Sequence, residues 1–270
     1  MVTGIVQRYL GKNVSINLGK VDAILNEAEM VKGEVFKATE RIKVYVLEVK
    51  DTPKGPRISV SRTHPDLVKR LFESEVAEVK DGTVEMKAIA REAGSRTKIA
   101  VKSNDQNVDP VGACVGLNGA RVNAIVNELR GEKIDIINWD DNPAYLIENA
   151  LSPAKVICVV ADEDSKEAQV IVPDYQLSLA IGKEGQNARL AARLTGYKID
   201  IKSETQAREM GLFEELGLDY QEDGGYEDYE SDYQEDGDTE YQEDYQEDDQ
   251  EDYQDGGLEE DSLEEDSQEK

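Results

Sequence analysis

The sequence predicts a multidomain protein in which a small all-β barrel precedes two related α+β units and a disordered acidic tail. Three observations support this prediction. Short alternating apolar patterns crowd residues 2–62, one glycine motif occurs twice, and acidic residues gather at the end of the chain. A chain of 270 residues has room for two or three small domains. We expect the barrel at 1–63, the α+β units at 64–140 and 141–208, and the tail at 209–270.

Residues 2–62 contain about five short segments with strand-like alternation. The segments are VTGIVQRY, NVSINLG, KVDAIL, IKVYVLEV and RISVSR. Glycines and a Pro-Lys-Gly-Pro turn separate them, as expected for strands joined by tight turns. Five strands in so short a span are typical of a small OB-type barrel. An SH3-like barrel is the alternative.

A Gly-x-x-Gly loop occurs twice, and each copy is followed by an amphipathic stretch and the strand sequence Lys-Ile-Asp-Ile. The first loop consists of Gly116, Leu117, Asn118 and Gly119, and the second of Gly182, Lys183, Glu184 and Gly185. A helical pattern and two strand patterns precede each loop, so the two units repeat one order of elements. Glycine lets another backbone come close, and a helix start exposes unpaired N–H groups, which suits a phosphate.

Acidic residues near the helix starts invite a metal-site interpretation. Asp140 and Asp141 precede Asn142-Pro143, where helix caps belong, so we expect them to serve as caps. Asp174 is expected to cap the helix that leads into the second loop.

The composition disfavours an enzyme and a membrane protein. The chain has one His and two Cys, with no phosphate-loop motif and no Cys-His set, and we expect no catalytic residue, no cofactor and no metal site. Cys114 and Cys158 lie far apart, and no apolar run is long enough for a signal peptide or a membrane span. We expect an intracellular, cytoplasmic protein whose cysteines are reduced and pack as small apolar side chains.

The order of helix, strand, strand, helix, Gly-x-x-Gly, helix and strand resembles the type II KH domain, and the preceding barrel resembles the S1 variety of OB fold. Barrel, KH and KH in this order, with the stretches SRTHPDLVKRLFESEV and VEMKAIAREAGSRTKIAVKS, resemble the bacterial NusA family of transcription termination and antitermination factors over residues 1 to about 208. The resemblance implies an elongation factor that binds single-stranded RNA, the nascent transcript, and acts in pausing, termination and antitermination. A KH and S1 protein of the ribosome or of an RNA-degrading complex is the alternative.

The resemblance also implies RNA polymerase and other elongation factors as partners, and no membrane. Family members begin with a helical domain that docks on polymerase, whereas this chain begins at Met1, at or just inside the first barrel strand. We therefore expect a fragment or a truncated product without that docking domain. The barrel run LGKNVSINLG has no aromatic residue, so base stacking there is expected to be weak. The remaining candidates on the barrel are Tyr9, Tyr45, Arg8 and Lys12.

In a KH module the glycine loop holds the backbone of about four nucleotides, while an apolar groove between helix and strand receives the bases. Carried over to this chain, both loops bind phosphates, and Arg189 contacts a phosphate or a base edge beside the second. The first loop has no lysine, so Arg121, Arg96 and Lys98 are expected to supply its charge, and we expect it to bind more weakly. A solvated surface is the alternative role for these basic residues.

The end of the chain is strongly acidic. Residues 214–270 carry 28 of the 59 acidic residues and one of the 31 basic residues, and they repeat Tyr-Gln-Glu-Asp. So few aliphatic side chains bury too little surface to offset the entropy of ordering, and we expect disorder. The segment is a solubilising spacer, a polyanion that competes with RNA for the basic grooves, or a segment that contacts a basic partner.

If the tail competes, deleting the residues after Gly211 raises the affinity for single-stranded RNA. A flexible tether holds the tail near the grooves at an effective concentration that reaches roughly millimolar values. The gain shrinks as salt is added, because the screening length falls from about 30 Å at 0.01 M to about 8 Å at physiological ionic strength. A salt series of RNA binding on both chains measures this gain. Equal affinities at every salt concentration would identify a spacer.

Overall fold

The computed structural model describes residues 1–53 and 55–215, all within one compact unit that spans Met1–Gln221. The predicted disordered tail falls almost entirely outside these residues. Within the described ranges, no helix has the length and the apolar character that crossing a membrane requires.

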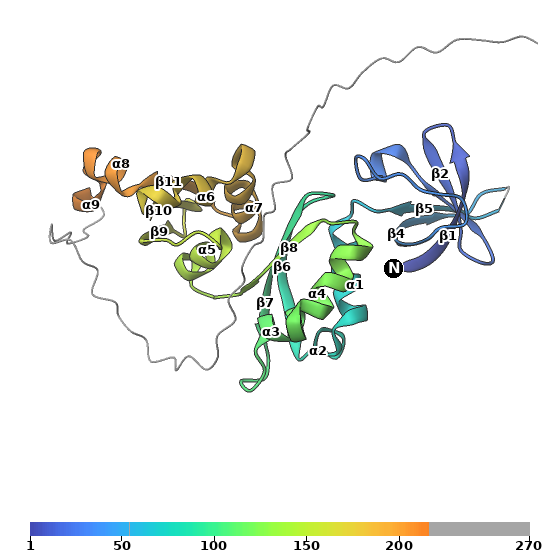
Figure 1. The fold of residues 1–270 in the computed structure, drawn as a ribbon, viewed down its shortest axis with the longest axis horizontal. Helices are drawn as coiled ribbons and strands as arrows, with labels where there is room; N and C mark the ends of the chain where they lie inside the picture. The colour runs from blue at the N-terminus through green and yellow to red at the C-terminus, as the bar shows by residue number, and fades with distance from the viewer. Residues whose placement is uncertain (54, 216–270) are drawn as a thin grey trace, which may run out of the picture. The chain divides into compact units, whose positions relative to one another are not determined.

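The N-terminal part is a closed five-stranded barrel with the strand order β1-β2-β3-β5-β4 (Figure 1). Its strands are β1 (Val2–Leu10), β2 (Asn13–Asn17), β3 (Asp22–Leu25), β4 (Arg41–Lys50) and β5 (Arg57–Ser61). β3 and β5 pair in parallel, whereas the other neighbours are antiparallel. Alternate side chains such as Val14, Ile16 and Val60 fill the interior. The barrel is consistent with the predicted OB type.

The first α+β unit follows directly. Its elements are α1 (Pro65–Glu75), α2 (Ala77–Lys80), β6 (Val84–Glu92), β7 (Arg96–Ser103), α3 (Pro110–Val115), α4 (Ala120–Glu128) and β8 (Lys133–Asn138). β7 pairs with β6 antiparallel and with β8 in parallel. α1 and α4 pack side by side against this sheet (Figure 1). Leu71, Ile99 and Ile125 belong to the core between them.

The second α+β unit repeats this order and this sheet. It contains α5 (Pro143–Leu151), β9 (Cys158–Asp162), β10 (Glu167–Val172), α6 (Leu177–Ile181), α7 (Gln186–Thr195) and β11 (Lys198–Ser203). β10 pairs with β9 antiparallel and with β11 in parallel, as β7 does with its neighbours. The predicted duplication is therefore confirmed at the level of topology.

None of the predicted caps, Asp140, Asp141 and Asp174, caps its helix in the structure. The Asp140 carboxylate accepts from the Asn142 N–H at 2.7 Å, before α5 begins. Asn142 caps α5, because its side chain accepts from the Ala144 N–H, whereas Asp141 accepts from the Lys102 ammonium. The prediction that Asp174 caps the next helix is wrong. Its carboxylate accepts from the backbone N–H and the hydroxyl of Thr205, at 3.3 and 2.8 Å.

The ordered chain continues past residue 208, where the sequence placed the start of the tail. α8 (Glu204–Glu209) and α9 (Leu212–Glu215) follow β11. Leu212 and Phe213 are buried in a small core with Ile171 and Ala207, because these apolar side chains interrupt the charged sequence. A truncation that preserves this core therefore keeps Leu212 and Phe213 rather than ending at Gly211.

The sheet of the first unit is covered on both faces. Successive side chains of a strand point to opposite faces, so Ile99 of β7 faces α1 and α4 while Ala100 faces the other way. Ala90, Ala100 and Ile137 on that other face belong to one core with α5 and α7 of the second unit. Small alanine side chains leave room for the helices to pack closely on the sheet.

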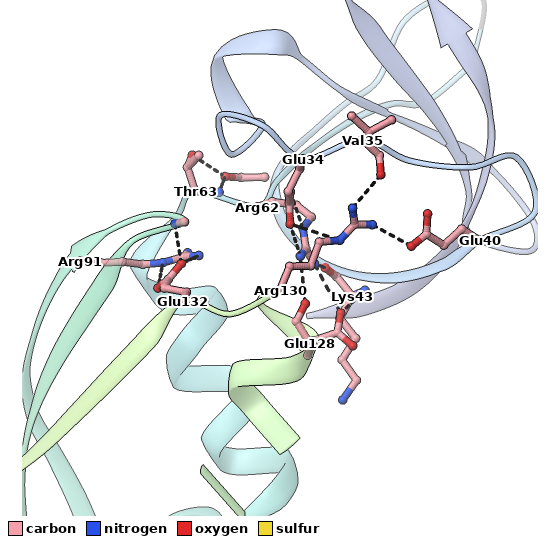
Figure 2. Close-up of polar contacts among 12 residues, drawn as sticks. Glu34, Val35, Glu40, Lys43, Arg62, Thr63, Arg91, Glu128, Arg130 and Glu132 are labelled. Atoms are coloured by element: carbon pink, nitrogen blue, oxygen red, sulfur yellow. Dashed lines mark hydrogen bonds and ion pairs between the residues drawn. The ribbon is translucent and has the colours of Figure 1, made fainter. Parts of the chain in front are cut away.

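A buried arginine joins the barrel to the first unit. Arg62 follows β5 and its side chain is 1% exposed. Its Nε lies 3.0 Å from both oxygens of the Glu34 carboxylate, and its Nη atoms donate to the carbonyls of Lys43 at 2.9 Å and Glu128 at 3.0 Å (Figure 2). Glu34 and Lys43 belong to the barrel, whereas Glu128 ends α4. We call these four residues the Arg62 cluster.

Arg130 reinforces the same junction from the turn after α4. Its guanidinium donates to the Val35 carbonyl and the Glu40 carboxylate, both at 2.7 Å (Figure 2). The guanidinium also lies 4.7 Å from the centre of the Phe36 ring. These partners all belong to the barrel. The junction therefore combines charged hydrogen bonds with a cation–π contact.

Replacing Arg62 by alanine is expected to destabilise the protein by about 3 kcal/mol or more, because it leaves the Glu34 carboxylate buried without its main partner. Urea unfolding measures this loss. Arg70→Ala is the matched control, since Arg70 pairs with Glu73 at the surface and such a pair contributes at most about 1 kcal/mol. Equal losses in the two variants would contradict the role given to Arg62.

Candidate nucleic-acid interface

The two glycine loops have nearly the same backbone conformation. Gly116 has φ 74° and ψ 172°, and Gly182 has φ 75° and ψ 171°. The third residue of each loop, Asn118 or Glu184, has a positive φ of 50° or 53°. Residues other than glycine rarely combine a φ near 75° with a ψ near 170°, so the turn requires glycine at positions 116 and 182. The repeat in the sequence therefore produces two copies of one local structure.

Each loop ends at the start of a helix whose first N–H groups have no side-chain cap. Gly119 precedes α4 and Gly185 precedes α7, and neither position supplies a capping hydrogen bond. The first N–H groups of a helix have no partner within the helix and carry a partial positive charge. Here the N–H groups of Ala120 and Gln186 donate to the loop carbonyls of Leu117 and Lys183. The partial positive charge at each helix start nevertheless favours an anion such as a phosphate beside the loop.

The two loops differ in their side chains. Lys183 in the second loop is exposed, and no contact within the described part of the chain engages its ammonium group. In the first loop the exposed residues are Leu117 and Asn118, neither of which is charged. Only the second loop therefore carries a free cation of its own.

Arg189 binds a carboxylate of the first unit. Its Nε lies 2.6 Å from Oε1 of Glu92, at the end of β6, and its Nη1 donates to the Glu184 carbonyl at 3.0 Å. Gln186 Nε2 donates to the same carboxylate at 2.9 Å, and Arg193 Nη1 lies 3.5 Å from it. We call Glu92, Gln186, Arg189 and Arg193 the Glu92 cluster. It joins the turn of the first sheet to the helix behind the second loop.

A recess of about 280 Å³ lies beside this cluster and the second loop. Its lining residues are Glu92, Ser95, Lys183, Glu184, Gln186 and Arg189. Cations and carboxylates alternate around it, so the Lys183 side is the part that suits a phosphate. The sequence does not reveal the roles of Glu92 and Gln186, because their partners lie more than 90 residues away along the chain.

The cations predicted for the first loop are already engaged. Arg121 Nη1 donates to Glu78 at 3.0 Å and to the Ala113 carbonyl at 2.6 Å. Arg96 pairs with Asp135 at 3.2 Å.

Lys98 lies in the interior of the protein. Its ammonium group is buried between the Ser152 carbonyl at 2.8 Å and Asp135 at 3.0 Å. Burial lowers the pKa of Lys98, although Asp135 opposes this effect. Because strand alternation turns Lys98 toward the face that α5 covers, its predicted role as a phosphate ligand does not fit its position.

A groove of about 340 Å³ lies between α3 and β8 of the first unit. Its lining residues are Asp109, Val111, Ile136, Ile137, Asn138, Asn149 and Ser152. The Asp109 carboxylate caps α3 by accepting from the N–H groups of Val111 and Gly112. This groove has the position, between helix and strand, at which a base was expected to bind.

The barrel tyrosines are used within the fold. Tyr45 stacks on His64 with ring centres 4.5 Å apart, and its hydroxyl donates to Asp66 at 3.0 Å. Tyr9 accepts a hydrogen bond from the Phe36 N–H at 3.0 Å. The stacking on His64 occupies one face of the Tyr45 ring, whereas Tyr9 is held through its hydroxyl and is 44% exposed.

Hydrogen bonds from Arg189 and then from Gln186 lower the pKa of Glu92 from its ordinary 4.5 to about 2. Because the folded pKa lies below the ordinary one, this contact stabilises the protein above about pH 4.5 and is lost as the pH falls toward 2. Arg189→Ala is expected to raise the pKa of Glu92, as measured by NMR titration of its carboxyl carbon. Arg193→Ala is the control with the longer contact and should raise it less. Equal shifts in both variants would contradict this assignment.

Comparison with known proteins assigns the two α+β units. Residues 62–139 match the family described as the NusA-like first KH domain, and residues 143–209 match the NusA-like second KH domain. The curated relatives include three proteins named "Transcription termination/antitermination protein NusA". The one from Bacillus subtilis is 61% identical over 79% of this chain, that from Halalkalibacterium halodurans 57% over 82%, and that from Mycobacterium bovis 50% over 76%.

The chain covers 57%, 58% and 61% of the length of these three relatives. Within the shared part, both KH domains match in the order that the fold displays, with the two glycine loops inside them. The chain therefore belongs to the NusA family.

Proposed function

We propose that this chain binds single-stranded RNA along its two KH domains and acts on the nascent transcript during elongation, in pausing, termination and antitermination. The observation that carries the proposal is the pair of Gly-x-x-Gly loops with one backbone conformation, each opening an uncapped helix. The names of the relatives support the transcriptional role.

In the proposed complex each loop binds the sugar-phosphate backbone through the N–H groups between its glycines, beside the positive end of the helix, and the bases turn toward the groove beside it. The second loop adds the free ammonium group of Lys183. Arg189 contacts the RNA backbone while its guanidinium also donates to the Glu92 carboxylate. The first loop acts mainly through Gly116, Gly119 and the N–H groups between them.

We further propose that the barrel is of the S1 type and extends the RNA surface through exposed basic side chains such as Arg8. The protein acts by binding alone, in the cytoplasm, with RNA polymerase and other elongation factors as its partners. Co-sedimentation with polymerase rather than with ribosomes tests the choice of partner. Incubation with labelled RNA tests the absence of cleavage.

Aspartate substitutions in the loops test RNA binding directly. Replacing Leu117, Asn118, Lys183 and Glu184 by Asp places negative charge against phosphate and keeps every loop glycine. Asp tolerates the positive φ of Asn118 and Glu184, so the fold is expected to survive. We expect RNA affinity to fall at least about tenfold, which is about 1.4 kcal/mol.

The measurement is fluorescence anisotropy with labelled single-stranded RNA, together with circular dichroism to confirm folding. Replacing Asp164 by Asn, in the turn between β9 and β10 away from either loop, is the surface control. A folded loop variant that binds RNA as tightly as the original chain would refute the proposed interface.

A further inference from the structure

We propose that α5 of the second KH domain forms the base-selecting wall of the first KH groove, with Asn149 contacting the edge of one RNA base and Tyr145 stacking on a neighbouring base. This inference rests on the proposed RNA binding and adds to it a specificity site shared by the two domains. Neither residue belongs to a glycine loop.

The wall is fixed to the groove by hydrogen bonds. Asn149 and Ser152 of α5 line the groove opposite Val111 of α3. Asn149 Nδ2 donates to the Asn138 carbonyl at the end of β8, at 3.2 Å, and the Ser152 carbonyl accepts from buried Lys98 at 2.8 Å. These bonds hold one face of α5 against the edge of the first sheet.

The chemistry of the groove suits a single base. Ile136, Ile137 and Val111 offer apolar contacts to the face of a ring. The Asn149 side chain uses one N–H for Asn138, which leaves its oxygen and its second N–H to pair with a base edge. An amide that presents a donor and an acceptor side by side distinguishes bases by the order of groups on their edges.

Tyr145 lies one helical turn before Asn149 on the same face of α5, because residues four apart are neighbours on a helix. Its side chain is 58% exposed, and no contact within residues 1–53 and 55–215 engages its ring. Tyr45, by contrast, is stacked on His64. An open aromatic ring beside a base groove suits stacking on the next base of a single strand.

The second KH domain has a different arrangement at the matching place. α8 follows β11 as α5 follows β8, but Thr205 at its start is bonded to Asp174 ahead of α6. The bond therefore links the start of α8 to the segment before α6. At the matching place in the first domain, Asp109 before α3 and Asn149 of α5 line an open groove. The difference assigns the selection of a base to the first groove.

The test measures binding of the full chain and its variants to oligo(A), oligo(C) and oligo(U), each of about eight nucleotides, twice the roughly four that one KH module holds. Asn149→Ala is expected to reduce the ratio between the strongest and weakest of the three affinities by about fivefold or more. Tyr145→Leu is expected to weaken all three by about fivefold or more, because stacking tolerates every base. Tyr145→Phe keeps the ring and should bind like the original chain.

Because Tyr145 is exposed, its variants are expected to fold, and a ratio of affinities does not depend on the fraction folded. Unchanged ratios in Asn149→Ala, or affinities in Tyr145→Leu within about twofold of the original, would overturn the inference while leaving RNA binding intact. Equal binding of all three RNAs by the original chain would also overturn it. Failure of the original chain to bind any of them would instead reject the proposed function itself.

Discussion

The two KH domains depend on one sheet face that the helices of the first domain leave uncovered. Ala90, Ala100 and Ile137 on that face share a core with α5 and α7 of the second domain. Burial of a Leu or Ile side chain stabilises by about 1.5–3 kcal/mol, whereas an exposed ion pair contributes at most about 1 kcal/mol. The apolar face therefore holds the domains together, and the partly exposed Glu92 cluster at its edge fixes how α7 is turned.

This shared face determines which side chains lie at the surface that is proposed to bind RNA. It places α5 beside the first groove, buries Lys98 and brings Glu92 to the arginines behind the second loop. In the proposed complex, two loops held at one separation give the second contact a high effective concentration, so that two individually weak sites suffice to bind one strand. The Arg62 cluster joins the barrel to α4 in the same way, which aligns a third domain with the first loop.

Local patterns allowed the elements and both glycine loops to be predicted from the sequence, because turns and strand alternation depend on neighbouring residues. The burial of Lys98 was not predictable in this way, since it depends on a helix whose Ser152 lies 54 positions later. The contact of Arg189 with Glu92 was not predictable for the same reason, because Glu92 is 97 positions away. Asp174 met the sequence rule for a cap, but Thr205 competes for its carboxylate. Contacts between residues far apart in the sequence decided each of these cases.

Each loop is held in its conformation by a side chain that packs over its first glycine, and this side chain differs between the two loops. Arg121 packs over Gly116, so that an added Cβ would lie 2.7 Å from its Cγ, and its guanidinium is bound to Glu78 and the Ala113 carbonyl. Asn187 packs over Gly182 in the same way, and its Nδ2 donates to the Leu151 carbonyl at 2.9 Å. Arg121 is therefore a structural part of its loop.

Positive charge at the loops then comes from the second domain, through Lys183. Binding of cations to phosphates releases counterions from the RNA, and this release contributes less to affinity as the salt concentration rises. Contacts to base edges, by contrast, carry the sequence preference. The first domain has an open groove with an amide wall and no free cation in its loop. In the proposed complex, the second domain would therefore supply salt-sensitive affinity for the RNA backbone, and the first would supply selection among bases.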